Sequence, residues 1–450
     1  MDAFWQYQLE VLNLLRDFIN SEKSRIDLVY DKVNDIEFLY LKNSVLSELW
    51  IRDFLPHIIN GNLEYLITGL FKKIPNLSNE EYNRLLANGV VLICIGQDNY
   101  AAYLSFPPKR TPTDSLCDPS NLFGARDGFN EVIADNRILI RKRVKSSTLL
   151  FEELFLGNMT STEINIVYLK KNEKLATKIK NILLKNTDRN ITSINDLNIL
   201  ITKQTLVPQF MYTSNPETCV NALLKDRIII LLDNSPVALI LPSSLLEFTE
   251  NSNETNNFSF VTLFNRLIIL VFLFITIFLL GLFILLTSHH PEALSSLFIA
   301  NFQLSERGTT FSLFIEIIIV LILFEFYRQL AMRSPLSFVQ NIIIIFGGLF
   351  IGQNAIEAGL IGTTAIIITS LSYVSSFAVT NNTYLINSFA IFRFFIMTMS
   401  YALGMIGFLV SSILVISYLA NIKVFDRYYL EPIIPFNFTK LKAWFIPRKD

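Results

Sequence analysis

The chain has few of the residues that carry enzymatic or redox chemistry. It contains three histidines and three cysteines among 450 residues, and the pair His289-His290 beside Pro291 lacks the spacing of a metal site. Scattered cysteines without a CxxC pair argue against a disulfide framework and fit a reducing interior. The sequence contains no phosphate-binding loop, nucleotide-binding glycine fingerprint, nucleophile elbow or kinase motif set. It therefore predicts a protein that is not an enzyme and uses no cofactor or metal.

Charge is also scarce. Charged residues make up 17% of the chain and the formal net charge is −1, whereas soluble domains carry about a quarter charged residues. A balanced charge gives no overall attraction to nucleic acid, and the aromatic residues form no RNA-binding pattern with basic neighbours. Nucleic acid is therefore not an expected partner.

Hydrophobic residues are in excess, at 51%, and they are concentrated after Val261. The N-terminal half is thus expected to face water, and the C-terminal half to lie largely in a bilayer. The opening residues do not read as a cleavable signal peptide. The first hydrophobic span is therefore expected to act as its own insertion signal.

The water-facing half alternates between strand-like and helix-like segments. This alternation predicts an α/β or α+β domain, divided near Lys145–Thr148 into lobes of residues 31–145 and 146–255. Residues 1–30 are expected to form a helical extension. The expected strands are Glu37–Leu41, Val90–Ile95, Ala101–Phe106, Ile164–Leu169, Ile228–Leu232 and Val237–Leu241. The expected helices are Glu48–Ile59, Glu80–Ala87, Asp127–Val144 and Lys174–Leu184.

An Asn-rich linker, Glu250–Asn257, precedes an α-helical multi-pass membrane domain expected over residues 256–422, with a cytoplasmic tail of residues 423–450. Phe264–Leu286 has about the 20 residues that cross a bilayer. Leu294–Phe302 is too short to span, and lies at the interface or re-enters. The further apolar runs are Phe311–Tyr327, Phe338–Ile351, Thr363–Val379 and Leu385–Leu419.

The last run holds one tilted helix or two short ones, because Gly404 and Gly407 interrupt it. The prediction is four to six spans. Basic residues place the end of the second run and the tail in the cytoplasm. The N-terminal domain is then expected in the cytoplasm as well. With both ends on the same side of the membrane the number of crossings is even, four or six.

Several ionisable residues fall within the apolar runs, and another directly follows the run Phe311–Tyr327. A charge at a helix centre costs about 2.5–3.5 kcal/mol on insertion scales, so it normally faces protein or water. Glu316 and Arg393 are candidate pore or coupling residues. Glu325 and Arg328 are three apart on one helix face and are a candidate structural ion pair. Interfacial snorkelling or structural pairing is the alternative for all four.

A polar break interrupts the apolar pattern near residue 353. Gly348 and Gly352 form a GxxxG motif and are candidate helix-packing residues. Gln353, Asn354 and Glu357 follow and are candidate pore or coupling residues. Irregular backbone in hydrocarbon is tolerated only where it is buried in protein or lines water. A solvent-facing turn is the alternative.

A basic cluster lies at the end of the expected helix Asp127–Val144. Cations at a helix C-terminus complement its dipole, so a solvated helix end is one interpretation. A docking surface for a partner or for anionic headgroups is the other. The cluster comprises Arg137, Arg141, Lys142, Arg143 and Lys145.

Several motifs follow one another from about Asp35 to the end of the chain. They are Gly124–Glu131, Asn136–Arg143, His290–Glu292, Arg333–Pro335, Phe346–Gly362 (FGGLFIGQNAIEAGLIG) and Phe425–Pro435 with Tyr429 and Pro432. In this order they make the chain resemble the A subunit of GerA-type spore germination receptors.

The resemblance implies a site of action in the inner membrane of dormant spores, in complex with a transporter-like B subunit and a lipoprotein C subunit. It implies nutrient sensing, and a homo-oligomer that forms or gates a path for monovalent cations. We expect Glu316 or the segment Gln353–Glu357 to face that path, where acids favour cations. A non-conducting membrane scaffold and a secondary transporter are the alternatives. A transporter predicts matching broken helices in an inverted repeat, and one such break is visible.

Overall fold

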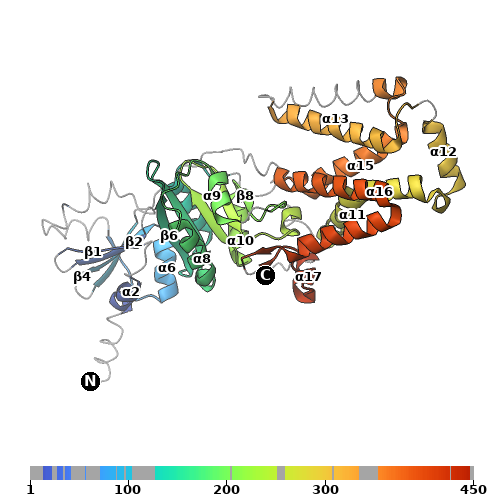
Figure 1. Cartoon of the computed structure of the whole chain (residues 1–450). Coiled ribbons are helices and arrows are strands. Elements are labelled where there is room, and N and C mark those ends of the chain that lie inside the picture. Colours follow the sequence, from blue (N-terminus) through green and yellow to red (C-terminus); the bar gives the residue numbers. More distant parts are fainter. Residues whose placement is uncertain are drawn as a thin grey trace. The chain divides into compact units, whose positions relative to one another are not determined.

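The computed structural model describes residues 14–22, 28–33, 36–41, 56, 71–87, 89–95, 98–103, 127–202, 205–250, 259–306, 309–333, 353–425 and 427–445 (Figure 1). The chain divides into two compact units. The first unit contains residues 1–204 and 210–242, and the second contains residues 205–209 and 243–450.

The first unit contains two antiparallel sheets of five strands. The first sheet has the order β1-β2-β4-β5-β3. Helices α2 (Leu14–Glu22) and α6 (Asn79–Ala87) share one apolar core with it, in which Phe18 and Tyr82 are fully enclosed. The strands are β1 (Leu28–Val33), β2 (Ile36–Leu41), β3 (Phe71–Lys73), β4 (Val90–Ile95) and β5 (Asp98–Tyr103).

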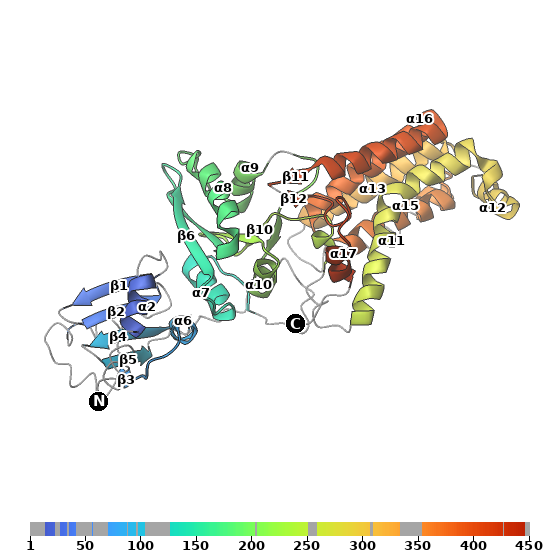
Figure 2. The same cartoon turned by 90° about the horizontal axis from the view of Figure 1, so that it is seen from below.

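The second sheet has the order β6-β7-β9-β10-β8 and carries helices on both faces (Figure 2). Because side chains alternate along a strand, Val167 of β7 packs with α7 and α10, whereas Tyr168 faces α8. The strands are β6 (Leu149–Leu156), β7 (Thr162–Leu169), β8 (Met211–Thr213), β9 (Ile228–Leu232) and β10 (Ala238–Leu241). The helices are α7 (Ile133–Arg143), α8 (Glu173–Leu184), α9 (Ile194–Ile201) and α10 (Pro216–Leu224).

Helix α7 begins later than the expected Asp127 for a local reason. The Asn130 side chain accepts a hydrogen bond from the Val132 amide at 2.9 Å, and the Asn136 side chain accepts one from the Asn130 amide at 3.0 Å. Asparagine side chains bond backbone groups in this way in turns and so compete with a helix. Helix α7 packs with the second sheet, ahead of the expected break near residue 145.

The second unit is mainly helical. Helix α11 (Ser259–Ile284) packs against α15 (Thr363–Val379) and α16 (Thr383–Asn421), and α13 (Leu313–Arg333) packs against α15. Its smaller elements are η5 (Leu285–His289), α12 (Ser296–Glu306), β11 (Lys423–Val424), β12 (Arg427–Tyr428) and α17 (Phe438–Phe445).

Two described helices, Phe260–His289 and Thr383–Asn421, are long and apolar enough to cross a membrane. The expectation of four to six spans is therefore corrected to two candidates among the described residues. Helix α13 carries Glu316, Glu325 and Arg328, and α15 has 17 residues. The run Phe338–Ile351, with Gly348, and Gly352 beyond it lie outside the described residues.

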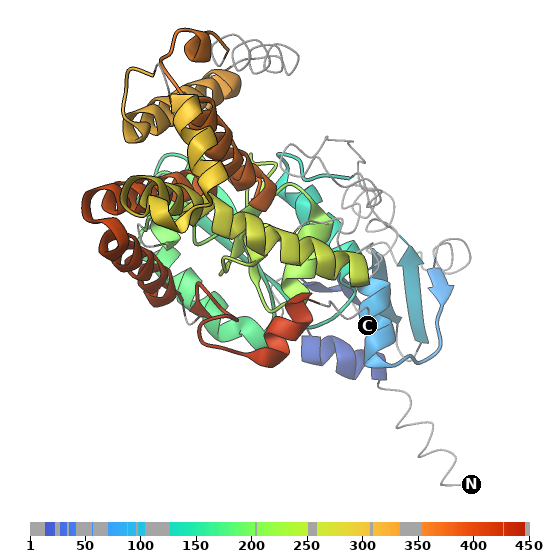
Figure 3. The same cartoon turned by 90° about the vertical axis from the view of Figure 1, so that its right-hand side faces the viewer.

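Helix α16 folds back on itself at Gly404, which has φ +60° and ψ −135°. The rings of Phe392 and Tyr418 lie 6.1 Å apart, although 26 residues of straight helix would separate them by about 39 Å. A Cβ on Gly407 would lie 1.9 Å from the Met399 carbonyl oxygen, so the close approach of the two halves requires glycine. The last apolar run is thus two helices that form a hairpin (Figures 1 and 3).

Candidate functional site

Glu316 lies near the start of α13 and is fully buried. Its Oε2 accepts a hydrogen bond of 2.9 Å from the amide of Gly362, the N-cap residue of α15. Amides at a helix start have no partner within the helix, so the carboxylate supplies one. Its Oε1 has no hydrogen-bond partner among the described residues. Glu316 therefore ties two helices together inside one chain.

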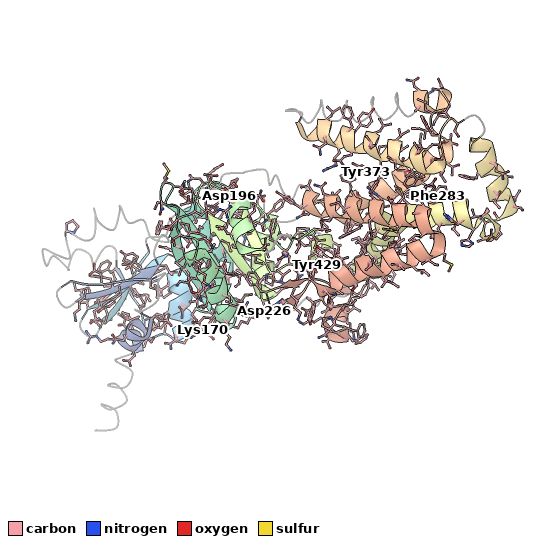
Figure 4. The ribbon with its side chains drawn as sticks, viewed as in Figure 1. Lys170, Asp196, Asp226, Phe283, Tyr373 and Tyr429 are labelled. Atoms are coloured by element: carbon pink, nitrogen blue, oxygen red, sulfur yellow. The ribbon has the colours of Figure 1, made fainter. Side chains whose placement is uncertain are left out.

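Arg393 of α16 is 3% exposed and joins three helices. Its guanidinium donates to the Ser372 carbonyl of α15 at 3.2 Å and lies over the Tyr373 ring at 5.4 Å. The Ser372 hydroxyl donates to the Thr276 carbonyl of α11 at 3.2 Å. Figure 4 marks Tyr373, whose hydroxyl donates to the Phe324 carbonyl of α13 at 3.3 Å.

Glu325 and Arg328 contact each other on α13. The guanidinium donates two hydrogen bonds to the carboxylate, at 2.9 and 2.5 Å. Gln329 donates a third at 2.9 Å. The Glu325 side chain is 44% exposed, so it borders the surface of the unit.

The segment from Gln353 to Glu357 is a short helical turn whose polar side chains are exposed, whereas Ala355 packs in the core of the unit. The Gln353 amide donates to the Glu357 carboxylate at 3.1 Å, and Asn354 is exposed beside them. Gly359, with φ +64°, accepts a hydrogen bond from the Thr310 amide at 3.0 Å ahead of α13. The segment thus lies at the Glu316 end of α15. Arg393 contacts α15 ten residues after Gly362, about 15 Å along the helix.

The basic residues of α7 are engaged within the first unit. Arg143 donates two hydrogen bonds to the Asp127 carboxylate at 2.6 Å and a third to the Leu139 carbonyl at 2.9 Å, and Arg137 pairs with Glu153. Arg141 is buried, donates to the Ser146 and Leu149 carbonyls, and lies over the Phe151 ring at 4.9 Å. The three arginines therefore make contacts that stabilise the first unit.

A second feature carries no sequence motif. The segment 205–209, which follows α9 and precedes β8, sits at the open end of the α16 hairpin. The Leu206 amide donates to the Tyr418 hydroxyl at 2.9 Å, and its carbonyl accepts from the Ser388 hydroxyl. Ser388 and Tyr418 belong to opposite halves of the hairpin. The single residue Leu206 therefore bridges them.

We call residues 205–209, 243–249 and 422–429 the junction, because backbone hydrogen bonds join the three segments. The Ser243 amide donates to the Gln209 carbonyl at 3.2 Å, and the Leu245 amide to the Tyr429 carbonyl at 2.9 Å. Tyr429, marked in Figure 4, is fully enclosed, and burial raises the pKa of its phenol far above the usual range. The phenol therefore stays neutral at any physiological pH.

A family model described as Bacillus/Clostridium GerA spore germination protein matches residues 57–449 of the chain. The chain belongs to this family. The match extends over the second sheet, the junction and every candidate membrane residue, and it confirms the resemblance predicted from the sequence.

Individual proteins agree with the family match. The chain is 33% identical to Spore germination protein XA of Bacillus anthracis, over 90% of this chain and 84% of that protein. It is 29% identical to Spore germination protein B1 of Bacillus subtilis (strain 168), over 79% and 74%. It is 27% identical to the uncharacterized membrane protein YfkQ of the same strain, over 75% and 66%. Two described helices of this GerA family member are long and apolar enough to cross a membrane.

A structural comparison finds the N-terminal domain of the A subunit of the Bacillus megaterium spore germinant receptor GerK3. The match covers 50% of this chain and 92% of that one, with 19% identity and a TM-score of 0.34.

Proposed function

We propose that this chain acts in spore germination as the A subunit of a nutrient germinant receptor in the spore inner membrane. The observation that carries the proposal is the family match over residues 57–449, which includes the second sheet of the first unit and the whole helical unit up to residue 449. The chain would assemble with a transporter-like B subunit and a lipoprotein C subunit. The tail would face the cytoplasm because it carries basic residues, and an even number of crossings would place the first unit on the same side.

In this proposal the junction transmits the nutrient signal. Segment 205–209 is covalently continuous with α9 and β8, and it is hydrogen-bonded to both halves of the α16 hairpin. A shift of this segment relative to the hairpin breaks at least one of the two bonds. Signal transmission needs an element with two arrangements whose balance a ligand changes, and a bridged hairpin can be such an element.

We further propose that copies of the chain surround a cation path with the segment Gln353–Glu357 at its entrance. Gln353 and Glu357 are exposed, whereas Glu316 is fully buried between α13 and α15. An exposed carboxylate can attract cations. Glu316 and Arg393 would then hold the helices around the path without lining it.

The experiment is Glu357→Gln in the full receptor, with Glu80→Gln on the exposed face of α6 as the matched control. Spores carrying each variant receive nutrient, and potassium release is measured. Glu357→Gln should slow release several-fold at unchanged receptor abundance, and Glu80→Gln should not. Equal release from both variants would remove the cation-entrance role.

A non-conducting scaffold is the second candidate. It is favoured by the partners that Glu316, Arg393 and the Glu325–Arg328 pair find within one chain. Purified receptor in potassium-loaded liposomes separates the two: the scaffold gives no nutrient-dependent conductance, and the channel does.

A further inference from the structure

Helix α17 packs against α11, and the contact includes Arg266 and Trp444. The Arg266 guanidinium lies 5.0 Å from the centroid of the Trp444 ring, and Trp444 is buried. Arg266 is the last charged residue of α11 before an uncharged apolar stretch of residues 267–284. Helix α17 lies beside these first turns (Figures 2 and 3). It is therefore at the depth where the candidate span changes from polar to apolar.

Large apolar side chains are exposed on and before α17. Phe436 and Phe438 are 70% and 67% exposed, and Ile433 and Ile434 are exposed beside them. On α11, Phe260 is 78% exposed. Aromatic side chains collect in this way at the level of lipid headgroups. Exposed aromatic side chains therefore occur both on the segment that leads into α17 and on α11, which is a candidate span.

The same segment is basic. Between residues 431 and 450 the sequence has four basic residues, Lys440, Lys442, Arg448 and Lys449, against two acids, Glu431 and Asp450. Lys440 pairs with Glu431, and Lys442 is exposed with no ion pair among the described residues. Lysines near an anionic membrane surface are attracted to it, each worth about 1 kcal/mol, or roughly fivefold.

We propose that residues 433–445 are an interfacial anchor that binds anionic lipid headgroups. Phe436 and Phe438 enter the boundary of the acyl chains, and the ammonium group of Lys442 contacts the anionic headgroups, with Lys440 and its partner Glu431 beside it. The buried face of α17, through Trp444, holds the anchor on α11. The assignment rests on α11 entering the bilayer and is independent of nutrient sensing or ion conduction.

The chain has three tryptophans, so one can be made a reporter. In the full chain with Trp5→Phe and Trp50→Phe, Trp444 is the only tryptophan. The protein is reconstituted in phosphatidylcholine liposomes that contain a small fraction of phosphatidylglycerol. Two samples are compared. In one the phosphatidylglycerol carries bromine at acyl positions 6 and 7, and in the other an equal small fraction of the phosphatidylcholine does. The measurement is quenching of Trp444 fluorescence by each brominated lipid.

Brominated phosphatidylglycerol should quench more strongly than brominated phosphatidylcholine, with an enrichment of roughly fivefold. Lys440→Gln with Lys442→Gln should bring the two lipids close to equal, whereas Lys170→Gln with Lys174→Gln on the first unit should leave the enrichment unchanged. Phe436→Ser with Phe438→Ser should weaken quenching by both lipids. If the two brominated lipids quench Trp444 equally in the protein that retains Lys440 and Lys442, the proposal is overturned. Absence of quenching by either lipid also overturns it and assigns the face to water or a protein partner.

Discussion

At the scale of residues, burial separates the acidic groups of the second unit into different roles. Glu316 has no exposed surface and accepts a hydrogen bond from a helix N-cap amide, whereas Glu357 is exposed and bonds only a neighbouring glutamine side chain in the described structure. In the sequence both are simply acids in an apolar context. Because their surroundings differ, the same Glu→Gln change is expected to affect protein stability at Glu316 and potassium release at Glu357.

For Glu316 the expectation concerns stability. Glu316→Gln keeps an oxygen that can accept from the Gly362 amide, and removes a carboxylate from apolar surroundings, which costs free energy when buried. Glu316→Leu leaves the amide unpaired, at a cost of about 1–3 kcal/mol. Thermal unfolding of the purified chain in detergent should therefore place the leucine variant below the glutamine variant. Equal unfolding temperatures would show that the hydrogen bond to Gly362 contributes nothing.

At the scale of elements, the α16 hairpin depends on close approach of its halves. Gly407→Ala would set a Cβ 1.9 Å from a backbone carbonyl oxygen, which cannot move without shifting the other half. Gly281→Ala, the comparison, would meet a side-chain methyl of Ile396 at 2.6 Å. Side chains adjust more cheaply than backbone.

Overpacking lowers the free energy of unfolding by about 1–3 kcal/mol. We expect the loss for Gly407→Ala to lie at or above the upper end of this range, and the loss for Gly281→Ala to lie below that upper end. The measurement is again thermal unfolding of the two purified variants. If Gly407→Ala unfolds at the higher temperature, the hairpin as described is incorrect.

Elements set by local pattern were predictable from the sequence, and those set by pairing were not. The apolar runs Val90–Ile95 and Ile228–Leu232 are strands β4 and β9 with the expected bounds. Strand β6, with the sequence LLFEELFL, was missed because leucine and glutamate favour helices. It is a strand because it pairs along its whole length with β7. Tertiary context overrides propensity in such cases.

One part of the candidate site was likewise predictable from the sequence, and another part was not. The pairing of Glu325 with Arg328 follows from a spacing of three on one helix. The junction includes Leu206, which is hydrogen-bonded to Ser388 and Tyr418; these follow it in the chain by 182 and 212 positions. It uses two ordinary hydroxyl groups and a backbone peptide, so a single sequence contains no pattern that marks it.

At the scale of the whole molecule, the junction brings three distant segments of the chain into contact. Segments 205–209, 243–249 and 422–429 come from three separate parts of the sequence and share a backbone hydrogen-bond network. Tyr418→Phe removes only the hydroxyl that accepts from the Leu206 amide. A hydrogen bond contributes about 0.5–1.5 kcal/mol net, so exchange of that amide should accelerate roughly two- to tenfold.

Hydrogen exchange of the peptide that contains residues 205–209 measures this effect in the full chain. Tyr401→Phe, which changes a hydroxyl elsewhere on α16, is the matched control. In spores, the Tyr418→Phe receptor should also change the nutrient dependence of potassium release. Unchanged exchange in Tyr418→Phe would mean that Leu206 is not held by the hairpin.

The geometry of Gly404 determines where the hairpin can move. A side chain there would meet the ring of His289, so the closed end fits tightly against the end of α11. The free end lies some 17 residues away, or about 26 Å. Opening the angle at Gly404 by about 2° therefore spreads the free tips by roughly 1 Å, enough to lengthen a 2.9 Å hydrogen bond beyond the usual limit. A small rotation at the closed end would therefore separate Ser388 from Tyr418, the two side chains that Leu206 bridges.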